Sequence, residues 1–176
     1  MHTLPEWDGL EARAPDRHGV AREPAEPRDR APDFEPGRPP RDAARRLSVL
    51  VADGHADAAE SLALLLWVGG HAPRVACGGD EAVRAAELDP PDVVLIDLRL
   101  PDRDGCEVVR QLRGRPWPKR PLLVALTGGG REDERRRALE AGIDVYLLKP
   151  VDPAALLRLL ARFARVVLPP AADQPR

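Results

Sequence analysis

Hydrophobic residues from about Leu47 onward fall into two alternating patterns. Short runs of consecutive Val, Ile and Leu are typical of strands that are buried on both faces of a parallel sheet. Between these runs, apolar residues recur three or four positions apart, which predicts amphipathic helices. The runs predict strands at residues 47–52, 74–76, 93–97, 122–126 and 145–148, and the spaced patterns predict helices at residues 58–68, 80–88, 106–113, 132–140 and 153–167.

Capping and turn residues separate these elements. Asp57 is a candidate N-cap of the first helix, and Gly69-Gly70 ends that helix. Asp152-Pro153 begins the last helix, with the proline in its first turn. The helix at 132–140 is densely charged, and we expect its charges to form a solvated face. Five strands that alternate with five helices imply right-handed crossovers, and therefore an α/β fold with a doubly wound parallel sheet.

The two ends of the chain lack both patterns. Residues 1–45 contain eight prolines and a mixture of Arg, Asp and Glu, so they bury too little apolar surface to offset the entropy lost on ordering. We expect a disordered tail at residues 1–45, one folded domain at residues 46–168 and a short C-terminal tail at residues 169–176. A chain of 176 residues, 43% of them hydrophobic, can build one core of ordinary size.

Charge and cysteine content argue against several classes of protein. A formal net charge of -2 provides no overall field that attracts nucleic acid or anionic lipid. Cys77 and Cys106 form neither a disulfide framework nor a metal-binding pattern, which is typical of a reducing cytosol. No apolar run reaches the length of a membrane helix, and the first residues lack a signal-peptide core. We expect a soluble, cytoplasmic protein that binds neither nucleic acid nor membrane.

Four of the predicted strands run into residues that can carry chemistry. These residues are Asp53, Asp97, Thr127 and Lys149. Open α/β sheets bind ligands outside the carboxyl ends of their strands, so we expect the four side chains to lie close together. Taken singly, each has a simpler reading, because an Asp can cap a turn and a Thr can bond to local backbone. Their joint position favours one functional site.

This set of strand-end residues resembles the receiver domain of two-component response regulators, the family of the chemotaxis response regulator. The resemblance covers residues 47–168 and implies a flavodoxin-like fold with strand order 2-1-3-4-5. It implies that Asp97 is the phosphoacceptor, that Lys149 binds the phosphate and that Thr127 is the switch hydroxyl. Tyr146, three residues before Lys149, matches the aromatic switch position of the family.

The loops beside the site contain residues that support it structurally. Gly105 fits a turn that needs either a close backbone approach or a positive φ, and Pro101 fixes the entry to that turn. The Lys149-Pro150 bond matches the cis peptide of the family, which helps to aim the lysine.

The metal ligands are where the chain departs from the family pattern. The family has two adjacent acids after the first strand, whereas this chain has Asp53 followed by Gly54. By resemblance, Mg²⁺ would be held by Asp53, Asp97 and the backbone carbonyl of Arg99. With one acidic ligand missing, we expect weak Mg²⁺ binding. His55 is an ordinary loop residue in this reading, since imidazole suits softer metals.

Two functional hypotheses stay open. The first is a single-domain response regulator, not an enzyme, that receives a phosphoryl group on Asp97 from a sensor histidine kinase or phosphotransfer protein and signals by docking to an unknown output protein. Only eight residues follow Leu168, so we expect the output to lie on another chain. The second is a pseudo-receiver, a phosphorylation-independent interaction module, which Gly54 favours. A flavodoxin-like nucleotide or flavin binder is disfavoured, since no glycine-rich phosphate loop follows the first strand.

Overall fold

The computed structural model describes residues 46–168, so the predicted tails at 1–45 and 169–176 lie outside the described residues. Strands and helices alternate along this part of the chain. The strands are β1 (Ser48–Ala52), β2 (Ala72–Ala76), β3 (Val93–Asp97), β4 (Leu122–Thr127) and β5 (Val145–Leu148). The helices are α1 (Ala56–Val68), α2 (Gly79–Leu88), α3 (Gly105–Arg113), α4 (Glu132–Ala141) and α5 (Pro153–Val167).

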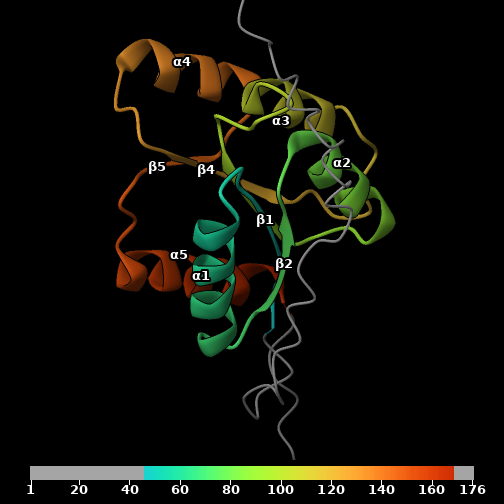
Figure 1. Cartoon of the computed structure of the whole chain (residues 1–176). Helices are drawn as coiled ribbons and strands as arrows, with labels where there is room; N and C mark the ends of the chain where they lie inside the picture. Colours follow the sequence, from blue (N-terminus) through green and yellow to red (C-terminus); the bar gives the residue numbers. More distant parts are fainter. Residues whose placement is uncertain (1–45, 169–176) are drawn as a thin grey trace, which may run out of the picture.

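The five strands form one parallel sheet in the order β2-β1-β3-β4-β5. Helices α1 and α5 cover one face of the sheet, and α2, α3 and α4 cover the other (Figure 1). The alternation of elements predicts this doubly wound arrangement, and the family resemblance implies this strand order, so both expectations are confirmed. Within residues 46–168, no helix combines the length and the apolar character needed to cross a bilayer.

Each face of the sheet packs its own hydrophobic cluster. The central strand β3 is buried along its whole length. Its alternate residues point to opposite faces, with Val94 and Ile96 in the cluster under α2, α3 and α4, and Val93 and Leu95 in the cluster under α1 and α5. Because both faces are covered, the strand reads in sequence as a continuous apolar run rather than as an alternating one.

Element boundaries differ from the predicted ones by more than one residue in two places, the starts of α1 and β2. The N-cap of α1 is His55, without a side-chain cap bond, so the prediction that Asp57 caps this helix is wrong. Asp57 lies in the first turn instead, where its negative charge faces the positive end of the helix dipole. Strand β2 begins at Ala72 rather than at residue 74, because its pairing with β1 starts where Ser48 lies opposite Ala72.

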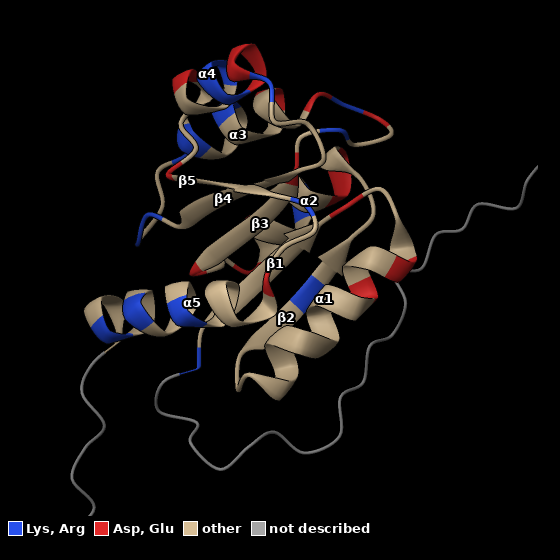
Figure 2. Ribbon diagram, turned by 90° about the vertical axis from the view of Figure 1, so that its left-hand side faces the viewer, with Lys and Arg blue, Asp and Glu red and all other residues tan. Residues whose placement is uncertain are grey.

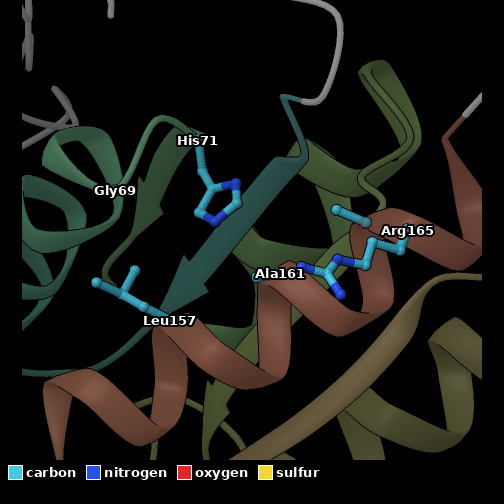
Figure 3. A pocket seen from close by; sticks show the side chains of 6 residues that line it. Gly69, His71, Leu157, Ala161 and Arg165 are labelled. Carbon is cyan, nitrogen blue, oxygen red and sulfur yellow. The ribbon is translucent and has the colours of Figure 1, made fainter. Parts of the chain in front are cut away.

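A cavity of about 350 Å³ lies between the loop after α1 and helix α5 (Figure 3). It is at the amino end of β2, whereas Asp53 and Asp97 lie at the carboxyl ends of their strands, so the length of the strands separates the cavity from them. It therefore takes no part in the predicted site. The side chains and backbone that line it belong to Gly69, His71, Leu157, Ala161, Ala164 and Arg165.

His71 is the buried titratable group of this cavity. Its residue is only 6% exposed, and its Nδ1 atom has no hydrogen-bond partner in the described part of the chain. Burial lowers the pKa of His71, and the positive charge of Arg46 lowers it further. The imidazole is therefore neutral in the folded protein at neutral pH.

This buried histidine should make stability depend on pH. Below about pH 6.5 this histidine binds a proton in the unfolded chain, whereas in the folded protein, with its lower pKa, it stays neutral. The free energy of unfolding should therefore fall as pH falls, with a limiting slope of about 1.4 kcal/mol per pH unit. Urea unfolding between about pH 7.5 and about pH 5.5 measures the slope. We expect His71→Gln to flatten it and His18→Gln, in the predicted tail, to leave it unchanged. Equal slopes in wild type and His71→Gln would contradict this account.

Candidate functional site

Two buried carboxylates and one ammonium meet at the carboxyl end of the sheet. Asp53 follows β1, Asp97 ends β3, and Lys149 follows β5. The Nζ atom of Lys149 lies 2.6 Å from Asp53 Oδ2 and 2.6 Å from Asp97 Oδ2. The sheet thus brings together three of the predicted site residues. In the sequence, Asp97 is 52 positions and Asp53 is 96 positions from Lys149.

A backbone N–H group orients each carboxylate. The amide of His55 donates to Asp53 Oδ1 at 2.9 Å, and the amide of Arg99 donates to Asp97 Oδ1 at 2.8 Å. Asp53 is 3% exposed and Asp97 is 6% exposed. Each carboxylate therefore uses one oxygen to hold the following loop and presents the other oxygen to the shared ammonium.

The ion pair between Asp53 and Lys149 shifts the pKa values of both groups. Burial alone would raise the pKa of Asp53, but the hydrogen bonds from Lys149 and from the amide of His55 outweigh burial and lower the pKa. Burial alone would lower the pKa of Lys149, but the bonds to Asp53 and Asp97 raise it. Asp53 and Lys149 therefore keep their charges at neutral pH, which makes this end of the sheet a preformed site for charged groups.

Thr127 is fully buried at the end of β4, and its hydroxyl is already engaged. It donates to Glu134 Oε1 at 3.0 Å and accepts from the amide of Gly129 at 3.1 Å. Tyr146 donates its phenolic hydroxyl to the carbonyl of Gly129 at 2.7 Å. The main chain links this group to the ion pairs, because the amide of Lys149 donates to the carbonyl of Thr127 at 2.8 Å.

Glu134 is the site residue that the sequence analysis missed. Acidic and basic residues are mixed along α4 (Figure 2), and most of them are exposed as predicted. Glu134 is half-buried, so the prediction of a wholly solvated charged face is wrong at this position. The available signal was the run Gly128-Gly129-Gly130 before α4, which leaves space for a side chain from the helix.

The loop after β3 packs tightly against the loop after β1. Gly54 has no positive φ, but a Cβ atom at this position would lie 2.8 Å from Cδ of Pro101. The backbone of Leu98 approaches Gly105 closely, as expected, since a Cβ atom at position 105 would lie 2.6 Å from the Cα of Leu98. Its φ is not positive, so close approach alone accounts for the glycine. The Lys149-Pro150 peptide bond is cis, as expected.

The oxygen donors at this edge of the sheet are of the chemical type that Mg²⁺ binds. Asp53, Asp97 and the main-chain carbonyl of Arg99 offer oxygen ligands, and Mg²⁺ is held in many sites by one or two carboxylates plus water. Within residues 46–168, however, no three His, Cys, Asp or Glu side chains cluster as a metal site. A cation would also compete with the ammonium of Lys149, which already contacts both carboxylates.

The sequence of this chain is similar to a known family model and to known proteins. The family model described as response regulator receiver domain matches residues 49–161. The transcriptional regulatory protein KdpE of Mycobacterium tuberculosis is 38% identical over 128 residues, which cover 72% of this chain and 55% of KdpE. The chain thus spans about half the length of that regulator. An uncharacterized 14.6 kDa protein of Leptolyngbya boryana is 33% identical over 125 residues, and the match covers 95% of that protein.

Solved structures agree with the sequence matches. The chemotaxis response regulator CheY4 of Vibrio cholerae has a TM-score of 0.62 and 25% identity, over 67% of this chain and 98% of CheY4. The receiver domain of the sensor histidine kinase PA1611 from Pseudomonas aeruginosa has a TM-score of 0.63 and 30% identity, over 68% of this chain and 98% of that domain. That structure is described with a magnesium ion coordinated in the active site cleft.

The shared ammonium predicts a distinctive stability profile for Lys149→Met. Two adjacent buried carboxylates without their cation should make the folded variant bind protons that the unfolded chain does not, so its stability should fall as pH rises from about 5 to about 8. At neutral pH we expect a loss of about 2 to 4 kcal/mol by urea unfolding.

The matched control is Lys119→Met, because Lys119 pairs with Asp92 nearer the surface. We expect that variant to lose less than about 1 kcal/mol, with no inverted pH profile. A Lys149→Met protein as stable as wild type at neutral pH would show that the two carboxylates do not depend on the ammonium.

Proposed function

The chain belongs to the response regulator receiver domain family, and from that premise we propose that it accepts a phosphoryl group on Asp97 and signals by docking to another protein. One observation carries the proposal. The ammonium of Lys149 lies 2.6 Å from the carboxylate of Asp97 at the carboxyl edge of the sheet, so a cation stands beside the nucleophile. A group transferred to Asp97 brings negative charge, which this cation can balance.

In the proposed reaction, a carboxylate oxygen of Asp97 attacks the phosphorus of a phosphohistidine on a sensor histidine kinase or phosphotransfer protein. An O–P bond forms and the P–N bond to the imidazole breaks, with its electron pair remaining on the imidazole nitrogen. The amide of Arg99 holds the other carboxylate oxygen, which orients the attacking one. Lys149 then pairs with the new phosphoryl oxygens while it keeps its contact with Asp53.

Mg²⁺ is the cofactor that the oxygen donors support, and Asp53, Asp97 and the carbonyl of Arg99 would hold it. When bound, it would neutralise charge on the transferred phosphoryl group. Because Gly54 supplies no carboxylate, the affinity for Mg²⁺ should be low. Lys149 supplies part of the charge balance without a metal, since its ammonium already contacts both acids.

The proposed output surface comprises α4, β5 and α5. Tyr146 connects the site to this surface, because its hydroxyl bonds to the loop before α4 while its ring lies on β5. Leu139 on α4 is 47% exposed and Leu148 on β5 is 53% exposed, which leaves apolar area for a partner. A change in the loop on phosphorylation would alter this surface, which is a population shift driven by a modification.

One observation favours a second candidate, a pseudo-receiver that binds its partner without phosphorylation. Pro101 fills the space that a side chain at position 54 would need, so the packing of these two loops leaves no room for the second acid. This candidate predicts that no phosphoryl group reaches Asp97 at any Mg²⁺ concentration.

The direct test of the proposed function is phosphorylation by a small donor. Incubation with acetyl phosphate or phosphoramidate and Mg²⁺ should add one phosphoryl group to the wild-type protein, measured as intact mass, and hydroxylamine should remove it, because an acyl phosphate is labile to that nucleophile. Asp97→Asn should abolish the addition, since an amide oxygen cannot form the acyl phosphate. Asp57→Asn, an exposed carboxylate in the first turn of α1, should leave it unchanged. Labelling of Asp97→Asn at the wild-type level would refute the assignment.

The missing acid gives a second prediction. Gly54→Asp alone should gain little, because its Cβ atom would press on Pro101. Gly54→Asp combined with Pro101→Ala should lower the Mg²⁺ concentration for half-maximal phosphorylation by at least about tenfold, since even indirect ligand partners are worth about that much. Pro101→Ala alone is the control and should not shift it. An unchanged Mg²⁺ requirement in the double variant would mean that another group already supplies the ligand.

A further inference from the structure

The hydroxyl of Thr127 has one proton, and that proton is committed to Glu134. The Oγ1 atom donates to Glu134 Oε1 at 3.0 Å, while its distance to the carbonyl of Gly129 is a long 3.5 Å. A hydroxyl donates one hydrogen bond only, so Thr127 cannot at the same time donate to a group on Asp97. In the described structure the switch hydroxyl therefore donates to Glu134 and not to the proposed phosphoryl site.

The position of Glu134 is specific to this contact. Its neighbours Glu132, Asp133 and Arg135 in the first turn of α4 are exposed, whereas Glu134 is half-buried. Withdrawing a carboxylate from water is costly unless it is hydrogen-bonded, and the Thr127 hydroxyl supplies that bond. The amino end of α4 also favours negative charge there. Thr127 and Glu134 thus stabilise each other's positions.

Gly129 is what lets Glu134 reach Thr127. A Cβ atom at position 129 would overlap Oε2 of Glu134, whereas a Cβ atom at Gly130 would make only ordinary contact with Leu148, at 3.5 Å. Neither glycine has a positive φ, so the requirement at position 129 is for space and not for backbone conformation. Even an alanine at position 129 would force the carboxylate of Glu134 to shift from the position in which it accepts from Thr127.

Tyr146 is tied to the same loop. Its hydroxyl donates to the carbonyl of Gly129 at 2.7 Å, and the negative charge of Glu134 adds to burial in raising the pKa of the Tyr146 phenol. Thr127, Gly129, Glu134 and Tyr146 therefore form one connected group, which we name the resting latch. Movement of the loop that carries Gly129 would change the surroundings of both switch residues.

We propose that Glu134 is a positioning residue that holds Thr127 in the resting position, and that phosphorylation of Asp97 competes with it for the Thr127 proton. The inference deepens the proposed function and rests on it for the identity of the competitor. Two anions, the Glu134 carboxylate and the phosphoryl group, then contend for one donor. The carboxylate sets how much of the unmodified protein occupies the active arrangement.

The chain provides its own probe, because Tyr146 is its single tyrosine. Biosynthetic labelling with 3-fluorotyrosine gives one ¹⁹F resonance that reports the latch. Without any phosphoryl donor, Glu134→Ala and Gly129→Ala should each move this resonance in the same direction, toward its position in the phosphorylated wild type. Loss of a charge-assisted hydrogen bond should raise the active population about tenfold.

The controls are on the same helix turn and in the same loop. Glu132→Ala removes an exposed charge of α4, and Gly130→Ala adds a methyl group where there is room, so both should leave the resonance in place. The double variant Glu134→Ala with Gly129→Ala should shift it no further than either single variant, since both changes break one contact. Thermal unfolding of each variant checks that the domain is folded.

The outcomes separate this inference from the proposed function. If wild type is not phosphorylated but the two variants still shift the resonance non-additively, the proposed function fails and the resting latch stands as a structural restraint. If wild type is phosphorylated and the resonance of Glu134→Ala stays where unmodified wild type has it, the latch is refuted. Additive shifts in the double variant would also refute it, because the two residues would then act independently.

Discussion

The site depends on one ammonium shared by two buried carboxylates. Asp53 and Asp97 end neighbouring strands in a region almost closed to water, where two uncompensated negative charges would be strongly unfavourable. Lys149 follows β5, on the far side of β4 from Asp97, and its side chain extends to both carboxylates. Its backbone is fixed by the hydrogen bond from its amide to the carbonyl of Thr127. The same cation therefore stabilises the folded edge of the sheet and prepares it for an anionic group.

The loops beside this ion pair are held to different degrees. After β3, the carboxylate of Asp102 accepts from the amides of Gly79 and Asp80 at the start of α2, and Asp104 accepts from the amide of Cys106 at the start of α3. These bonds tie that loop to two helices. After β4, the loop is held by side-chain bonds that involve Glu134 and Tyr146 rather than by bonds to helix amides.

Two glycines near the site are required for space rather than for an unusual backbone. At Gly54 the space is filled by the ring of Pro101, and at Gly129 it is filled by the carboxylate of Glu134. Gly54 leaves the metal-binding edge without the second acid of the family pattern, and Gly129 leaves room for an acid beside the switch hydroxyl. Negative charge beside Asp53 is therefore lower than the family pattern implies, while Glu134 brings one carboxylate to Thr127.

The sequence by itself determined the order of elements, the sheet and the strand ends that meet. A strand covered on both faces must be a continuous apolar run, and parallel strands place residues such as Asp97 and Lys149 at one edge. Only the tertiary structure decided that His55 rather than Asp57 precedes α1, that Pro101 occupies the space beside Gly54 and that Glu134 bonds to Thr127. The reason is physical: hydrophobic periodicity records which residues are buried against a sheet, whereas these contacts depend on the paths of loops and on distances between side chains.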